Sequence, residues 1–127
     1  MATQALNVLV ENGNITVKQG TNASWAYVLK KDGVPVDITG WSCACQVRLT
    51  YDSSTALLTL TIDNAKVTNG GVDGTFTLYL APTDTSVIAF KGELLECVYD
   101  VEITDGAGLK TRIAEGLFII DREVTKV

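Results

Sequence analysis

The sequence predicts an all-β protein, an Ig-like antiparallel β-sandwich of about seven or eight strands with at most one short helical turn. Apolar and polar residues alternate with a period of two through much of the chain, as they do in half-buried strands. Turn-forming residues separate these alternating segments at short, regular intervals, a spacing typical of two-sheet sandwiches. At 127 residues, the chain is expected to form a single domain over residues 1–127.

The clearest predicted strand runs from Trp41 to Thr50. Its apolar face would carry five residues, Trp41, Cys43, Cys45, Val47 and Leu49. The same alternation recurs in four further segments, Trp25-Tyr27-Leu29, Leu58-Leu60-Ile62, Phe76-Leu78-Leu80 and Cys97-Tyr99-Val101-Ile103. Strands near residues 14–18 and 110–120 complete the set.

Turn residues place the connections between these strands. The segment Asp105-Gly106-Ala107-Gly108 lies between two alternating runs and predicts a hairpin. Gly116 interrupts the last run and indicates a bulge or bend. The segment after Pro82 is expected to be a short connector between strands of opposite sheets, and the alternative is a helical turn capped by Thr83 to Thr85.

The two ends of the chain are predicted to be assembly arms, residues 1–12 and 121–127. Their expected contact residues are Leu6, Val8, Val10, Ile120, Arg122, Val124 and Lys126. An exposed strand edge can pair with another subunit, which is the reason for this choice. The equally weighted alternative is that these segments are ordinary edge strands of one monomer.

Composition excludes several classes of function. Ten basic and fifteen acidic residues give a net charge of −5, which argues against nucleic-acid binding because that requires clustered Lys and Arg. The chain has no histidine, which excludes histidine-containing catalytic triads and metal sites with histidine ligands. No apolar run is long enough for a membrane span, and the first ten residues lack the features of a secretory signal. Synthesis in a cytoplasm is therefore expected.

The three cysteines are expected to be buried free thiols. Cys43 or Cys45 could pair with Cys97 over a span like that of immunoglobulin domains, but Trp41 and Tyr99 do not fit the rest of that pattern. A reducing cytoplasm also disfavours a disulfide. The spacing of Cys43 and Cys45 is wrong for a metal site, so no metal or cofactor is expected.

No catalytic site is predicted. Asp100 and Glu102 fall on the outward face of a strand, where solvated charge is the expected state. Glu93 and Glu96 form a second acidic pair without an indicated cleft. No small-molecule substrate is therefore expected. Five rings could line a sugar-binding face, but their phase in the strands favours core packing: Trp25, Trp41, Tyr27, Tyr79 and Tyr99.

A series of short motifs resembles a family of virion proteins from tailed bacteriophages. Asn14-Ile15-Thr16-Val17-Lys18-Gln19-Gly20 is followed by Gly33-Val34-Pro35-Val36-Asp37-Ile38-Thr39-Gly40, then by Tyr99-Asp100-Val101-Glu102, Arg112, Gly116 and Val124-Thr125-Lys126. The order of these motifs is similar to that in the N-terminal domain of siphophage upper baseplate proteins. Ile38 replaces a leucine of that pattern, and Lys126 replaces its last arginine.

The resemblance implies a non-enzymatic virion component in a tail, baseplate or adaptor, which docks to other virion proteins and to copies of itself. A capsid decoration protein is a closely related alternative. An alternative of another class is a glycan-binding module for host recognition. It would expose Trp or Tyr as a shallow platform, whereas the assembly hypothesis expects those rings to be buried.

Overall fold

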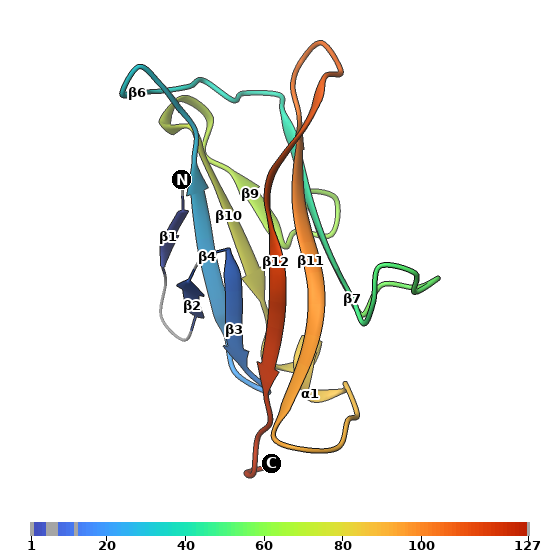
Figure 1. Ribbon diagram of the computed structural model, residues 1–127. Helices are drawn as coiled ribbons and strands as arrows, with labels where there is room; N and C mark the ends of the chain where they lie inside the picture. The colour runs from blue at the N-terminus through green and yellow to red at the C-terminus, as the bar shows by residue number, and fades with distance from the viewer. Residues whose placement is uncertain (1, 5–7, 12, 127) are drawn as a thin grey trace.

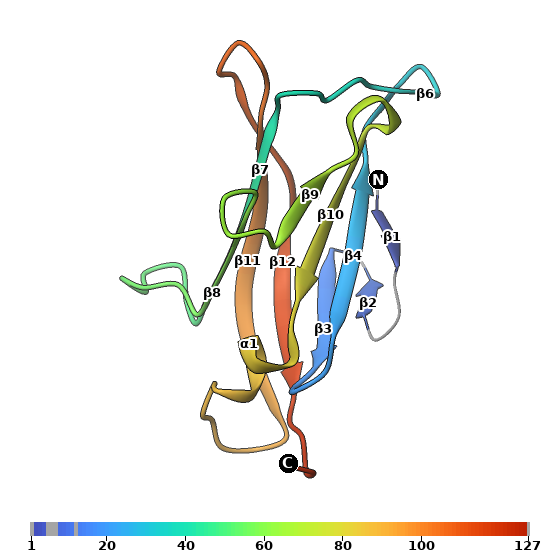
Figure 2. The same cartoon turned by 180° about the vertical axis from the view of Figure 1, so that it is seen from behind.

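The computed structural model of the chain describes residues 2–4, 8–11 and 13–126. Two β-sheets pack face to face, and the chain ends at one pole of the resulting sandwich (Figure 1 and Figure 2). The Ig-like β-sandwich expected from the sequence is confirmed.

The four-stranded sheet has the spatial order β1-β4-β10-β9. These strands are β1 (Ala2–Gln4), β4 (Ala23–Val28), β10 (Thr75–Leu80) and β9 (Val67–Asn69). The six-stranded sheet has the order β2-β3-β12-β11-β7-β8. Its strands are β2 (Val8–Glu11), β3 (Asn14–Lys18), β12 (Lys110–Asp121), β11 (Leu94–Thr104), β7 (Ser42–Arg48) and β8 (Leu58–Thr61). The orders β1-β4-β10-β9 and β12-β11-β7-β8 match the A-B-E-D and G-F-C-C′ arrangement of Ig-like domains.

Three small elements lie outside the two sheets. They are the ribbon of β5 (Lys30–Lys31) and β6 (Val34–Pro35), the 3₁₀ turn η1 (Gly71–Asp73) and the short helix α1 (Pro82–Ser86). α1 lies between β10 of one sheet and β11 of the other, so the segment after Pro82 is the expected connector and also contains the helical turn. The strands beyond the predicted seven or eight are short pieces of two to four residues at sheet edges and in this ribbon.

One strand pair departs from the expected antiparallel arrangement. β3 runs parallel to β12, with Ile15 opposite Phe118 and Val17 opposite Ile120. A parallel pair needs a long crossover connection, and nearly the whole domain between these two strands supplies it. All the other strand pairs that the structure describes are antiparallel.

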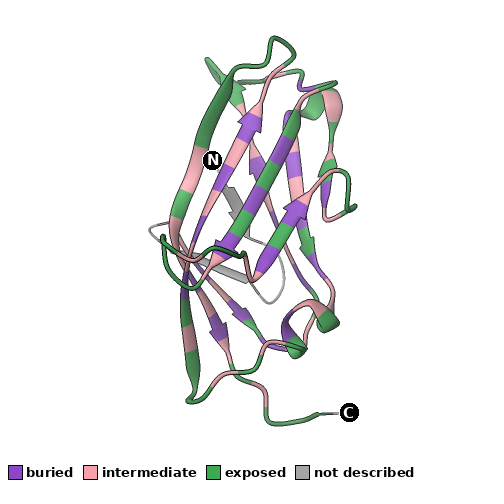
Figure 3. Ribbon diagram, turned by 90° about the vertical axis from the view of Figure 1, so that its right-hand side faces the viewer, coloured by how far each residue is buried: buried purple, intermediate pink, exposed green. Residues whose placement is uncertain are grey.

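The core lies between the sheets, and buried residues alternate with more exposed ones along the longer strands (Figure 3). In β11 the predicted inward set is confirmed: Cys97, Tyr99, Val101 and Ile103 are buried. Leu49 is a correction, because it is 48% exposed although its phase placed it in the core. β7 ends at Arg48, and a turn follows in which the Thr50 nitrogen donates to the Ser53 hydroxyl at 3.0 Å.

The β11–β12 pair contains the predicted hairpin, but its bulge is not at the predicted residue. Asp105 closes the hairpin by accepting from the nitrogens of Ala107 and Leu109, each at 2.9 Å. The extra residue is Ile113, because the register passes from Ala114 to Arg112 between two consecutive residues of β11. Gly116 instead lies in register, opposite Tyr99.

All three cysteines are free and buried, as expected. Cys43 and Cys45 lie on β7, which is next to β11 in the same sheet, so they do not face Cys97 across the core. Cys45 is opposite Val101, and Cys97 lies four residues further along β11, about 13 Å away at the usual rise of a strand. This separation is too large for a disulfide.

Within the described residues, no helix is both long enough and apolar enough to cross a membrane.

Candidate functional site

The predicted assembly residues fall in two different places. Leu6 lies outside the described residues. Val8 and Val10 belong to β2, opposite Val17 and Ile15 of β3, so the main chain of the first arm pairs within its own monomer. β1 likewise pairs with β4. The first arm therefore forms edge strands of both sheets.

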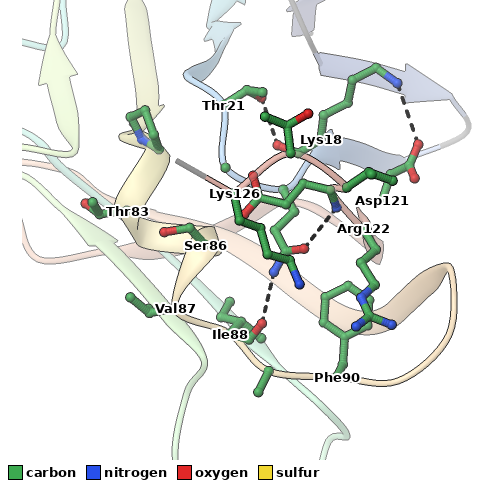
Figure 4. A pocket seen from close by; sticks show the side chains of 17 residues that line it. Lys18, Thr21, Thr83, Ser86, Val87, Ile88, Phe90, Asp121, Arg122 and Lys126 are labelled. Atoms are coloured by element: carbon green, nitrogen blue, oxygen red, sulfur yellow. Dashed lines mark hydrogen bonds and ion pairs between the residues drawn. The ribbon is translucent and has the colours of Figure 1, made fainter.

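The second predicted arm divides at the end of β12. Ile120 is a correction, because its side chain is fully buried in the core and cannot be a contact surface. Ile120 lies on the inward face of β12 beside Phe118, where the alternation places it. Arg122, Val124 and Lys126 are exposed and line the same groove at the pole where the chain ends; Figure 4 labels Arg122 and Lys126 there. We call residues 122–126 the C-terminal segment.

Gln19 organises this pole. It is a buried polar side chain in the turn after β3. Its Nε2 donates to the carbonyl oxygens of Thr85 at 3.2 Å and Ile88 at 3.0 Å. Its Oε1 accepts from the main-chain nitrogen of Glu123 at 3.1 Å. One side chain thus joins three chain segments, and each of its polar atoms has a partner.

Gly20 extends this junction. Its nitrogen donates to the Thr85 hydroxyl at 2.8 Å. Gly20 has φ +78°, and a Cβ on it would come within 2.0 Å of a carboxylate oxygen of Glu123. The backbone conformation therefore favours glycine, and the flexible Glu123 side chain would have to move to admit a Cβ.

Arg122 fixes the C-terminal segment to the loop that follows α1. Its nitrogen donates to the Glu93 carbonyl at 2.9 Å, and its Nη1 lies 3.4 Å from the Gly92 carbonyl. Its guanidinium carbon lies 6.0 Å from the centre of the Phe90 ring, at the limit of a cation–π contact. Lys18 and Asp121 form an exposed ion pair nearby, at 3.6 Å.

A groove of about 870 Å³ runs between α1 and the C-terminal segment (Figure 4), and Gln19 is among the residues that line it. Its walls carry exposed apolar side chains, of which Val87 is 77% and Val124 is 94% exposed. Ile88 and Phe90 are half-buried beside them. Apolar side chains at a concave, hydrogen-bonded junction make this pole a candidate docking surface, which we call the C-terminal groove.

A second hollow, of about 390 Å³, lies on the outer face of the six-stranded sheet. Asp100 lies there as predicted, partly exposed, and is paired with Arg112 at 3.3 Å. Arg112 also reaches Glu115 at 3.1 Å. Arg48, which also lines this hollow, donates to Gln46 Oε1 at 2.8 Å and to the Ser53 carbonyl at 2.9 Å. The charges of this hollow largely satisfy one another.

The aromatic side chains do not gather on a surface. Trp25, Tyr27 and Tyr99 are buried, and Trp41 is half-buried against the core. Burial raises the pKa values of both Tyr27 and Tyr99. Tyr79 is partly exposed and donates to Asn22 at 3.1 Å. Core packing, preferred from the sequence for most of these rings, is thus correct for the buried ones.

The described residues hold no group of three or more His, Cys, Asp or Glu side chains that could bind a metal ion. In the same part of the chain, every buried side-chain nitrogen and oxygen has a hydrogen-bond partner. The features that distinguish the pole are therefore shape and exposed apolar area rather than a reactive group.

Sequence reasoning missed Gln19 and the groove that it supports. Gln19 stands in a turn, where a polar residue is ordinary, and no periodicity marks it as buried. Val87 falls in the segment expected to be a connector between strands, and its exposed side chain contributes to the candidate docking surface.

No protein-family model matches the chain, and a comparison with curated proteins finds no match. Among solved structures, the chain is similar to murine CRIg, with a TM-score of 0.41 and 8% sequence identity. That similarity covers 98% of this chain and 99% of the CRIg chain.

Proposed function

We propose that this protein is a non-enzymatic structural component of a tailed-bacteriophage virion, which docks to neighbouring subunits through the C-terminal groove. A tail, baseplate or adaptor position follows from the motif resemblance between Asn14 and Lys126. The neighbours would be other virion proteins and copies of the same chain. The chain would be made in the host cytoplasm and then incorporated into the particle.

The observation that carries the docking proposal is the exposure of Val87 and Val124 on a fixed framework. Exposed apolar side chains gain free energy when a partner covers them, and a preorganised surface loses little entropy on binding. Gln19 and Arg122 supply that preorganisation by holding the C-terminal segment against the loop after α1.

Two alternative functions make different predictions. A capsid decoration protein would use the same groove on a capsid lattice, so it differs only in the position of the chain in the particle. A glycan-binding module would expose an aromatic platform, and it is less well supported because Trp25, Tyr27 and Tyr99 are buried. Tyr51, which is 84% exposed at the rim of the outer-face hollow, is the ring that such a module would use.

The experiment combines particle composition with a surface substitution. We expect the chain in purified particles by mass spectrometry, and its density at a fixed subunit interface by cryo-electron microscopy. Val124→Asp places a charge on the groove and should reduce incorporation about tenfold, because burying an unpaired charge at a contact is costly.

The matched control is Val72→Asp. Val72 is 70% exposed in η1, which lies near the end of the sandwich opposite the C-terminal segment (Figure 1). The Val72→Asp substitution introduces the same charge and should leave incorporation of the chain into particles unchanged. Absence of the chain from particles, or equal loss with both variants, would overturn the docking proposal. Specific binding of host glycan that Tyr51→Ala abolishes would favour the glycan-binding alternative.

A further inference from the structure

β8 is the last strand of the six-stranded sheet and pairs with β7 on one side only. Its other side is a sheet edge, which could accept a strand from another molecule. The Thr59 carbonyl and the Thr61 nitrogen lie at this edge. Their hydrogen-bond partner is in the turn that follows β8, not in β7.

Asn64, in the turn after β8, points its side-chain amide back at this edge. Its Nδ2 donates to the Thr59 carbonyl at 2.7 Å, and its Oδ1 accepts from the Thr61 nitrogen at 3.0 Å. In a parallel strand pair, one residue accepts from and donates to main-chain groups of two residues that are two positions apart. The Asn64 amide therefore takes the place of the main-chain N–H and C=O groups of one residue in a neighbouring strand.

The turn that carries Asn64 is itself held in place. The Lys66 nitrogen lies 3.2 Å from the Thr61 carbonyl and 3.1 Å from Asn64 Oδ1. The Asn64 nitrogen donates to the Thr61 hydroxyl at 3.2 Å. Lys66 Nζ is paired with Asp84 of α1 at 2.6 Å, and both side chains are largely buried. The amide is therefore presented to the edge in one orientation.

We propose that Asn64 closes the β8 edge against strand addition by a second copy of this chain. The excluded partner is the β8 edge of another molecule, which would pair antiparallel across a two-fold axis. Such a pair would need the Thr59 carbonyl and the Thr61 nitrogen, and Asn64 already occupies both groups. Asn64 is thus a specificity-determining residue that directs self-association away from β8. This inference goes beyond the virion role and does not depend on it.

The test measures self-association of the purified chain. Asn64→Ala frees the two main-chain groups, and we expect the dissociation constant for self-association to fall about tenfold or more in sedimentation velocity. Asn64→Asp keeps the acceptor and loses the donor, so it should have an intermediate effect. The matched control is Asp63→Ala, an exposed neighbour in the same turn, which should behave like the wild type.

A double variant separates edge pairing from general loss of stability. The Thr59 nitrogen points to the same side as its carbonyl, away from β7, so proline there removes only an outward donor. Thr59→Pro combined with Asn64→Ala should restore the wild-type sedimentation profile.

Association of Asn64→Ala that persists in this double variant would overturn the proposal. Unchanged association of a folded Asn64→Ala, with its circular dichroism spectrum intact, would also overturn it. If Asn64→Ala does not fold, the same readings apply to Asn64→Asp and to its combination with Thr59→Pro. Particle incorporation is not measured here, so failure of this proposal is distinguishable from failure of the virion role.

Discussion

The main-chain nitrogen of Glu123 donates a hydrogen bond to the side-chain oxygen of Gln19 at 3.1 Å, although 104 residues separate them in the sequence. The same Gln19 amide reaches the Ile88 carbonyl with its nitrogen. One side chain therefore links both walls of the C-terminal groove.

Gln19→Leu should lower the free energy of unfolding by about 2–3 kcal/mol, because it leaves two carbonyls and one amide without partners at similar side-chain volume. Chemical denaturation followed by tryptophan fluorescence would measure this loss. Gln46→Leu is a suitable control because the Gln46 side chain is exposed, and its effect should be small. Equal stability of Gln19→Leu and the wild type would show that the junction contributes nothing to the fold.

Gly116→Ala should destabilise the protein by about 2 kcal/mol through overpacking. An added Cβ would meet the Gly13 carbonyl oxygen at 2.5 Å and Asn14 Oδ1 at 2.9 Å. These atoms are fixed, because Asn14 Oδ1 accepts from the Leu117 nitrogen at 2.9 Å. Gly106→Ala is the matched control, since nothing lies within 4 Å of its Cβ. Thermal unfolding should separate the two variants clearly, and similar midpoints would contradict the close approach.

Tyr99→Phe should cost about 1 kcal/mol of stability, because the Tyr99 hydroxyl donates to the Gly13 carbonyl where β3 begins. The matched control is Tyr79→Phe, because the Tyr79 hydroxyl donates its hydrogen bond to Asn22 at the surface. That control should change stability by less than about 0.5 kcal/mol. A larger effect at Tyr79 than at Tyr99 would be inconsistent with the burial of the two rings.

The free energy of unfolding should fall in alkaline solution, because the buried thiols ionise less readily in the folded state than in the unfolded chain. Burial raises the pKa of Cys43 to about 12, and it also raises the pKa of Cys45. In the unfolded chain a thiol ionises near about pH 8.5, so the unfolded state loses its protons first as pH rises. The stabilising contribution is complete below that pH and is lost progressively as pH rises towards about 12.

Urea unfolding at about pH 7.5 and about pH 10 would measure this change. Cys43→Ala should show a smaller difference between the two pH values than the wild type, whatever its stability at neutral pH. A difference that is identical in the two proteins would mean that the Cys43 thiol does not carry the effect.

Much of the sandwich could be predicted because burial in a strand follows a period of two. The inward residues of β11 follow this period without exception, from Cys97 to Ile103. The prediction failed where a strand ended or changed register, at Leu49 and at Gly116. Local sequence does not encode where pairing stops, because the partner strand and the following turn decide it.

Only some of the residues that line the candidate docking surface were singled out from the sequence. Arg122, Val124 and Lys126 lie at the C-terminal groove, whereas Ile120 is buried. Alternation through Phe118 would have placed Ile120 in the core. Gln19 and the Asn64 amide act through contacts that only the folded chain creates, so no pattern in the sequence identifies them.

The β11–β12 hairpin at Asp105–Gly108 projects from the end of the molecule opposite the C-terminal segment (Figure 1). Its tip is exposed, and the Cβ positions of Gly106 and Gly108 meet no other atoms within 4 Å. An affinity tag or fluorophore inserted at this tip would therefore leave the groove unobstructed, which makes it the preferred attachment point for pull-down or imaging reagents.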